Sequence, residues 1–106
     1  MIRITVTQKD GAYVSVESEG HAGYAEEGQD IICSAVSVLI VNTVNSIETF
    51  TEDRILCESD DGYVYFSFPD GHGEKTELLV KSLLLGLDSI RRDYGTKYLK
   101  IAFREV

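Results

Sequence analysis

The chain has 106 residues, of which 43% are hydrophobic and 26% charged, with a single proline, so its composition excludes a disordered or low-complexity chain. The length fits one domain over residues 1–106, and the formal net charge of -8 creates a field that repels the phosphates of nucleic acids. The same field attracts cationic partners, so a basic peptide is a favourable ligand.

A first hairpin is predicted at the start of the chain. Apolar and polar residues alternate over residues 2–7, and after a turn at residues 9–11 the apolar positions are Ala12, Val14 and Val16. Because strand-like alternation begins at once, no room is left for the charged head and apolar core of a signal peptide. We therefore expect a cytoplasmic protein.

Residues 20–30 are predicted to form a loop, because periodicity disappears there and three glycines interrupt polar and acidic residues. A helix is predicted from Ile31 to near Thr49, with Asp30 as its N-cap. Apolar side chains occur on most sides of its first turns, so its beginning should be largely buried. Its nearly apolar stretch, residues 31–41, is shorter than the roughly 20 residues that cross a bilayer, and no membrane span is expected.

A second hairpin and a second helix are predicted in the other half of the chain. Residues 54–59 and 63–68 flank a turn at residues 60–62. The helix that follows has apolar residues at spacings of three and four, and Gly95 suits a left-handed cap at its end. Residues 98–106 then form a last strand.

The order of these elements is strand, strand, helix, strand, strand, helix, strand. This order favours the α+β class, with an antiparallel or mixed sheet packed against two helices. No internal repeat or linker is visible, so we expect a single domain.

The sharpest chemical signal is a histidine and a cysteine at the two ends of the loop, where His21 precedes Cys33 by twelve positions. If Asp30 is the N-cap, Cys33 is the third helical residue, where unpaired amides and the helix dipole stabilise a thiolate. The amides of Cys33 and Ser34 would also be available to an oxyanion. This arrangement indicates nucleophilic chemistry with His21 as the base.

Each of these residues also has a purely structural interpretation. Cys33 can be a small buried hydrophobe, and His21 a strand-end residue that bonds a backbone carbonyl. Cys57 lies inside a strand pattern and is expected to pack, and both cysteines are expected to be free thiols. His72, between glycines, is predicted to be a solvated turn residue. A metal site formed by His21, His72 and Cys33 is a weaker alternative.

Several positions between residues 20 and 37 form one pattern: a glycine-histidine-alanine triplet, a glycine and an aspartate before the helix, and a cysteine with a serine four residues later. These positions are Gly20, His21, Ala22, Gly28, Asp30, Cys33 and Ser37. The pattern resembles the ribosomal-processing cysteine protease family of bacteria. Ser34 stands where alanine is expected and Gly95 where proline is frequent, but neither departure affects the cysteine and histidine.

The resemblance implies a homodimeric cytoplasmic endopeptidase that removes an N-terminal extension from a bacterial large-subunit ribosomal protein. It implies a catalytic dyad of Cys33 and His21, and this chemistry requires no metal or organic cofactor. The negative net charge and the short apolar stretch lead us to expect no direct contact with nucleic acid or a membrane. The supporting positions would be Asp30, Ser37, Ser34 and Gly20. Two other functions stay open, namely a non-enzymatic ribosome-assembly or protein-binding module and a thiol redox sensor that oxidises Cys33.

Overall fold

The computed structural model describes the backbone of residues 1–20 and 27–106, and the side chains of residues 1–20 and 31–106. The elements occur in the predicted order, which confirms the α+β class. They are β1 (Ile2–Lys9), β2 (Ala12–Glu19), α1 (Glu27–Phe50), β3 (Leu56–Asp60), β4 (Tyr63–Ser67), α2 (Glu74–Tyr94) and β5 (Leu99–Glu105).

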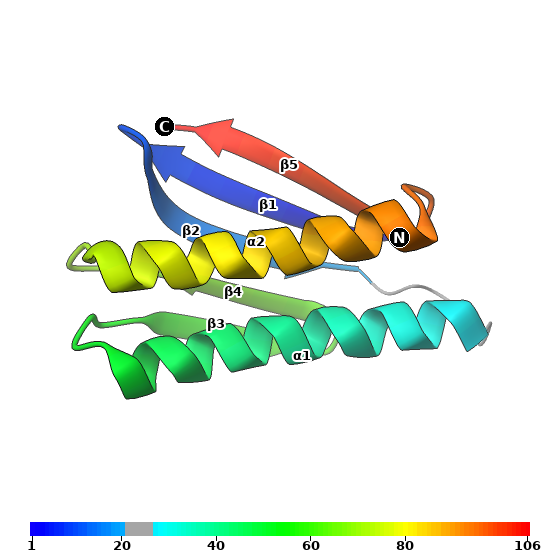
Figure 1. Ribbon diagram of the computed structural model, residues 1–106, viewed down its shortest axis with the longest axis horizontal. Helices are drawn as coiled ribbons and strands as arrows, with labels where there is room; N and C mark the ends of the chain where they lie inside the picture. The colour runs from blue at the N-terminus through cyan, green and yellow to red at the C-terminus, as the bar shows by residue number, and fades with distance from the viewer. Residues whose placement is uncertain (21–26) are drawn as a thin grey trace.

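The five strands form one mixed sheet in the order β3-β4-β2-β1-β5. Neighbouring strands are antiparallel, except that β5 runs parallel to β1. Both helices cover the same face of this sheet, and α1 lies beside α2 (Figure 1). One layer of helices on one layer of sheet leaves a single core between them.

The core is formed by the inward side chains of the strands and the inner sides of both helices. The alternation predicted for β1 is confirmed, since its apolar residues are at most 3% exposed. At Gly86 of α2 the helices approach closely, because a Cβ there would lie 3.0 Å from Cδ1 of Leu39. The buried apolar residues are Ile2, Ile4, Val6, Val16, Ile32, Val36, Ile40, Val44, Ile47, Phe66, Phe68, Val80, Leu83, Leu84, Leu87 and Leu99.

A bulge interrupts the alternation of β2. Thr7 pairs with Ser15, but the next residue of β1, Gln8, pairs with Tyr13, so Val14 is an extra residue in β2. Tyr13 therefore packs against the core, while Val14 is only half-buried. The regular alternation predicted through Val14 was wrong for this physical reason.

Helix α1 begins at Glu27, earlier than predicted, so Asp30 lies inside its first turn and is not the N-cap. Acidic residues near a helix N-terminus interact favourably with the helix dipole, and this extends the helix into the segment predicted as a loop. The expected burial of its beginning holds for Ile32, which is 1% exposed, but not for Ile31, which is 57% exposed. By length and composition alone, Ile31–Phe50 could cross a membrane, a criterion that core helices of soluble proteins also meet.

Helix α2 is capped from outside its own sequence. Its N-cap, Gly73, has no side chain to offer, and Asp53 from the α1–β3 connection takes that role. Oδ2 of Asp53 accepts hydrogen bonds from the amide of Gly73 at 3.1 Å and from the hydroxyl of Thr76 at 2.5 Å. At the other end Gly95 has φ 96° and ψ 155°, so its φ is positive as predicted but its backbone is not left-handed helical.

Candidate active site

A cleft of about 320 Å³ lies between the first half of α1 and the strands beneath it, and Cys33 forms part of its wall. Its floor is apolar and its rim is polar and acidic. It is lined by Ile2, Ser18, Gly20, Cys33, Val36, Ser37, Ile40, Val41, Ser59, Asp60, Asp61, Gly62, Tyr63 and Val64. The sheet order explains this composition, because it brings the β3–β4 turn beside the end of β2.

Cys33 is half-buried, packs against the core and is not in a disulfide. Because α1 begins at Glu27, Cys33 lies in the second turn of the helix and not at the third position. In a regular α-helix the amides of Cys33 and Ser34 bond carbonyls four residues earlier, so they are not the orphan donors that we expected. The prediction of an oxyanion site at these two amides is therefore wrong.

Of the predicted supporting residues, the structure brings Ser37 and Gly20 to the cleft beside Cys33. Ser37 lies one turn after Cys33 on the same side of α1, as the helical spacing predicts. Ser34 is exposed and does not line the cleft. His21 lies outside the described residues, and of Asp30 only the helical backbone is described.

Gly20 fixes the chain immediately before His21. Its φ is +100°, and a Cβ at this position would overlap the backbone carbonyl oxygen of Met1, so only glycine fits. The amide of Gly20 donates a hydrogen bond of 2.9 Å to the carbonyl of Gly62 in the β3–β4 turn. This bond ties the start of the segment that contains His21 to the rim of the cleft.

The acidic rim of the cleft is a feature that sequence reasoning missed. Asp60 and Asp61 were recognised only as turn residues, and nothing in their distance from Cys33 along the sequence indicates that they line the same cleft. Tyr63, also on the rim, donates a hydrogen bond of 3.1 Å to Oε2 of Glu17. Desolvation raises the pKa of the Tyr63 hydroxyl, and the bond to Glu17 raises it further. The carboxylates of Asp60 and Asp61 therefore offer negative charge to a ligand that binds beside Cys33.

The second cysteine lies elsewhere. Cys57 is exposed on the edge strand β3 and is not among the residues that line the cleft. Partial desolvation raises the pKa of its thiol, and the carboxylates of Glu48 and Glu58 raise it further. A raised pKa keeps this thiol protonated and weakly nucleophilic at neutral pH.

His72 is not a solvated turn residue, because its side chain is only 8% exposed. Its Nε2 lies 2.6 Å from Oε1 of Glu77, and its ring packs against Phe68 with centroids 4.5 Å apart. It precedes α2, which starts at the opposite end of the molecule from the start of α1 (Figure 1). His72 and Cys33 therefore do not share a site, and among the described residues no group of three potential metal ligands occurs.

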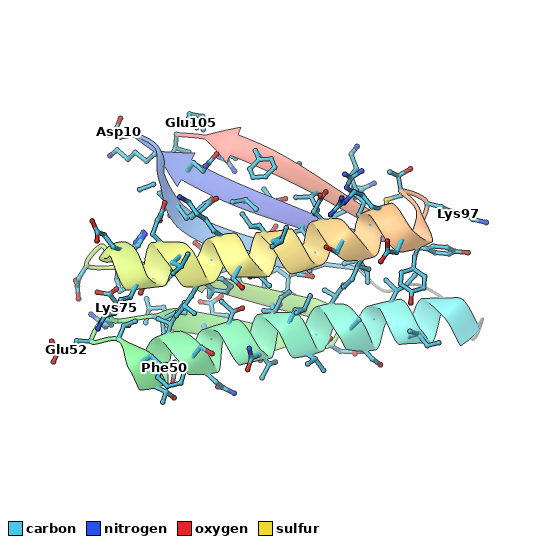
Figure 2. All side chains as sticks on the ribbon, viewed as in Figure 1. Asp10, Phe50, Glu52, Lys75, Lys97 and Glu105 are labelled. Carbon is cyan, nitrogen blue, oxygen red and sulfur yellow. The ribbon has the colours of Figure 1, made fainter. Side chains whose placement is uncertain are left out.

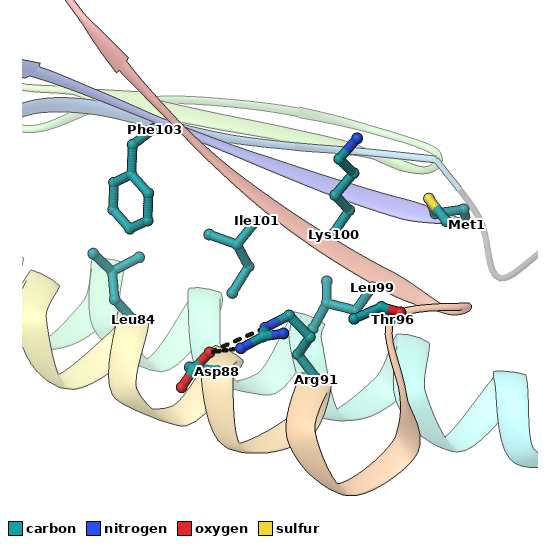
Figure 3. A pocket seen from close by; sticks show the side chains of 9 residues that line it. All are labelled: Met1, Leu84, Asp88, Arg91, Thr96, Leu99, Lys100, Ile101 and Phe103. Carbon is teal, nitrogen blue, oxygen red and sulfur yellow. Dashed lines mark hydrogen bonds and ion pairs between the residues drawn. The ribbon is translucent and has the colours of Figure 1, made fainter.

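A second cavity of about 560 Å³ lies between α2 and β5 (Figure 3). Leu84, Ile101 and Phe103 form its apolar wall, and Arg91 donates two hydrogen bonds to Oδ1 of Asp88 beside it. Among the residues that the structure describes, no cysteine, serine or histidine lines this cavity. The cleft that contains Cys33 is therefore the better candidate for the active site.

Comparison with known proteins identifies relatives of this chain. The family model of the cysteine protease Prp matches residues 1–100. The ribosomal processing cysteine protease Prp of Bacillus subtilis is 34% identical over 101 residues, which cover 89% of this chain and 90% of the relative. The Staphylococcus aureus enzyme of the same name is 30% identical over 98 residues, which cover 90% of this chain and 92% of the relative.

Solved structures agree with the fold. A Streptococcus mutans protein superposes with a TM-score of 0.90 and 31% identity, covering 100% of this chain and 96% of that chain. Prp from S. aureus in complex with a substrate peptide superposes with a TM-score of 0.90 and 26% identity, covering 98% of this chain and 100% of that chain. The same enzyme with a covalently linked product peptide superposes with a TM-score of 0.88 and 27% identity, with the same coverage of both chains. The chain therefore belongs to the Prp family of ribosomal processing cysteine proteases and is a cysteine peptidase.

Proposed function

We propose that the chain is an endopeptidase that removes the N-terminal extension of a bacterial large-subunit ribosomal protein, with Cys33 as nucleophile and His21 as base. The observation that carries this proposal is the position of Cys33, which is half-buried in the wall of a cleft large enough for peptide side chains. The S. aureus relative, solved in complex with a covalently linked product peptide, supports a peptide substrate for this chain.

In the proposed reaction His21 takes the proton of the Cys33 thiol, and the thiolate attacks the carbonyl carbon of the scissile peptide bond. A carbon–sulfur bond forms as the carbon–nitrogen bond breaks, and His21 returns the proton to the departing amine. Water, deprotonated by His21, then hydrolyses the thioester and releases the new carboxylate together with the free thiol. The reaction needs no metal or redox partner.

The charge of the molecule favours a basic substrate. Ribosomal proteins bind an RNA polyanion and are typically cationic, whereas this chain carries a net charge of -8. Asp60 and Asp61 place part of the negative charge on the rim of the cleft. Basic side chains near the cleaved bond would be attracted there, while the apolar floor would receive apolar side chains.

Two residues of the cleft have supporting roles in this proposal. Gly20 directs the chain into the segment that contains His21, and Ser37 offers a hydroxyl group one turn from Cys33. Asp30 would act near the same site from the first turn of α1. We also propose, from the family resemblance, that the enzyme is a cytoplasmic homodimer.

The decisive experiment incubates the purified protein with the N-terminally extended and the mature ribosomal protein and follows both by mass spectrometry. One truncation of the extended form and none of the mature form are expected. His21→Ala should slow the truncation by roughly a hundredfold or more, since general base catalysis contributes about that much. Binding of the extended protein without any truncation would contradict the proposal and favour a binding module.

A further inference from the structure

The outer face of the sheet, which points away from both helices, is not covered by any described element (Figure 1). On β4 the side chain of Phe66 is buried in the core, so Tyr65 beside it points to the outer face. Tyr63, two residues before Tyr65, shares this face. Both tyrosines are half-buried, and their Cα atoms are separated by roughly 7 Å along the strand. Two aromatic rings therefore lie in a row on an uncovered surface.

Each of these tyrosines lies between two carboxylates in the register of the sheet. Tyr65 is opposite Glu17 of β2 on one side and Glu58 of β3 on the other. Tyr63 is flanked in the same way, nearer the β3–β4 turn. Residues that are paired across strands point to the same face, so all these side chains lie on the outer face. We call this set the tyrosine face, and it consists of Glu17, Glu19, Glu58, Asp60, Tyr63 and Tyr65.

The side chains of the tyrosine face influence one another across three strands. Desolvation raises the pKa of the Tyr63 hydroxyl, and the hydrogen bond to Glu17 and the charge of Glu58 raise it further. Within residues 1–20 and 31–106, the carboxylates of the face form no ion pair with a basic side chain. Like charges on neighbouring strands destabilise a sheet. A cationic ligand would relieve this repulsion.

We propose that the tyrosine face binds an extended basic segment of the substrate protein, outside the residues that enter the cleft. The identity of the partner as substrate rests on the proposed function. A lysine or arginine side chain binds over a tyrosine ring, and carboxylates on both sides of the ring accept its hydrogen bonds. In an extended segment, side chains two residues apart point the same way at roughly 7 Å, which is the spacing of the two tyrosines. Basic residues at alternate positions therefore match both rings.

The tyrosine face is continuous with the cleft. Asp60 and Tyr63 line the cleft that contains Cys33, and they are also the first row of the face. The β3–β4 turn, at residues 61–62, lies between the two surfaces. A substrate chain that leaves the cleft over this turn meets Tyr63 first and then Tyr65. The cleft would thus hold the residues around the cleaved bond, and the face would hold a segment further along the same chain.

Charge identifies the occupant as a basic peptide. The molecule has a net charge of -8 and the face carries four carboxylates, so nucleic acids and anionic lipids are repelled. On the same side of the sheet, basic residues are confined to the other border, at Arg3 of β1 and Lys100 and Arg104 of β5. A single metal ion does not fit either, because no three potential ligands converge among the described residues.

Binding can be measured without cleavage, so this test does not depend on the proposed function. Fluorescence anisotropy follows a labelled peptide of alternating lysine and serine residues on the full-length Cys33→Ala variant. The peptide should bind, and its binding should weaken as the salt concentration rises. Adding Glu58→Lys should weaken binding roughly fivefold, because one attraction is lost and one repulsion is gained. No measurable binding to the parent chain would overturn the proposal.

Glu105→Lys is the matched control for Glu58→Lys. Both glutamates are exposed and lie on the two edge strands, but Glu105 is at the far end of β5 (Figure 2). Both substitutions change the net charge by the same amount, so Glu105→Lys should bind the peptide within about twofold of the parent chain. An equal loss in both variants would mean that overall charge and not the tyrosine face attracts the peptide, and would overturn the proposal.

The aromatic ring is tested separately at Tyr65. Tyr65→Phe keeps the ring and should retain binding, whereas Tyr65→Leu should weaken it roughly threefold. Circular dichroism establishes that these variants fold. Binding by Tyr65→Leu that equals the parent chain would overturn the role of the ring. Sedimentation velocity should give the same molecular mass with and without Glu58→Lys. A change of mass would show that the face contacts a second copy of the chain, which also overturns the proposal.

Cleavage tests the link to the substrate. In the otherwise wild-type enzyme, Glu58→Lys should raise KM for the whole extended ribosomal protein roughly fivefold with kcat unchanged, as expected for lost binding. A short peptide that spans only the cleaved bond and lacks basic residues should be cleaved as by the wild type, because Glu58 does not line the cleft. Unchanged KM for the whole protein would overturn the proposal. If the wild type cleaves neither substrate, the proposed function fails, whereas binding of the basic peptide stands.

Discussion

The two helices lie side by side on one face of the sheet but have opposite surfaces. On α2, exposed leucines are interspersed with charges, and Asp88 accepts from Arg91 and pairs with Arg92. On α1, charges are absent from residue 31 to residue 47, and Phe50 at its end is 68% exposed (Figure 2). The helix suited to water carries no candidate catalytic residue, whereas the helix unsuited to water carries Cys33. The comparison indicates that α2 serves the fold and that α1 serves binding and chemistry.

The largest effect is expected from the two cysteines. Cys33→Ala should lower kcat/KM for the extended ribosomal protein by roughly four orders of magnitude or more, as is usual when a nucleophile is removed. Cys57→Ala, on the edge strand, should stay within about twofold of the wild type, because this thiol lies outside the cleft. Stopped time-course cleavage measures both. Cleavage at the wild-type rate by Cys33→Ala would show that the nucleophile does not lie on α1.

A second test uses two glycines with positive φ. Gly20→Ala should lower kcat/KM roughly a hundredfold, because the overlap with Met1 displaces the chain beside the cleft. Gly11→Ala is the matched control, since Gly11 has φ +82° but open space around it. It should cost only about 1 kcal/mol of stability, from the positive φ, and leave cleavage unchanged. Similar kinetics for the two variants would show that the link from Gly20 to the rim is not needed.

The inner sides of the helices should be equivalent, unlike their outer sides. Ile40→Ala on α1 and Leu87→Ala on α2 remove side chains that are 1% and 0% exposed. Each should reduce the free energy of unfolding by about 2–5 kcal/mol, the usual cost of a core cavity. Urea unfolding of both variants gives this comparison. A much smaller loss for Ile40→Ala would mean that α1 contributes little to the core and would sharpen its functional role.

The smallest effect is expected at Asp53, in the connection between α1 and β3. Hydrogen bonds from Thr76 and Gly73 lower the pKa of Asp53. A carboxyl group with a lowered pKa stabilises the fold above its unfolded pKa of about 3.9, and this contribution is lost as the pH falls through the folded value. Asp53→Asn should therefore show a slightly flatter loss of stability below about pH 4. Thermal unfolding from pH 7 to pH 3 measures the difference; identical profiles would show that Asp53 does not cap α2.

Much of the fold followed from periodicity, because long amphipathic segments and turn residues act locally. The second helix and both hairpins were predicted on that basis. The start of α1 was not, since Glu27 and Gln29 suit a helix as well as a polar loop. The bulge at Val14 depends on pairing between strands, which a single strand pattern does not reveal.

The candidate site was predictable only in part, for a similar reason. Cys33 and Ser37 share one helix, so their spacing placed them together. Asp60 and Tyr63 reach the cleft through the strand order, in which β4 pairs with β2. His72 seemed solvated because its glycine neighbours suggested a turn, yet its partner Glu77 lies five residues further on, in α2. Position in the sheet decides how Asp60 and Tyr63 reach the cleft, whereas the helix that follows His72 decides its contact with Glu77.

The parallel pairing of β1 with β5 has a consequence for the newly made protein. Residues 99–105 are translated after every other element, yet β1 lies between them and β2 in the finished sheet. Until they emerge from the ribosome, β1 lacks one neighbour and Leu99 is missing from the core. Ile2, at the start of β1, lines the cleft. The cleft therefore takes its final form only after β5 has been made.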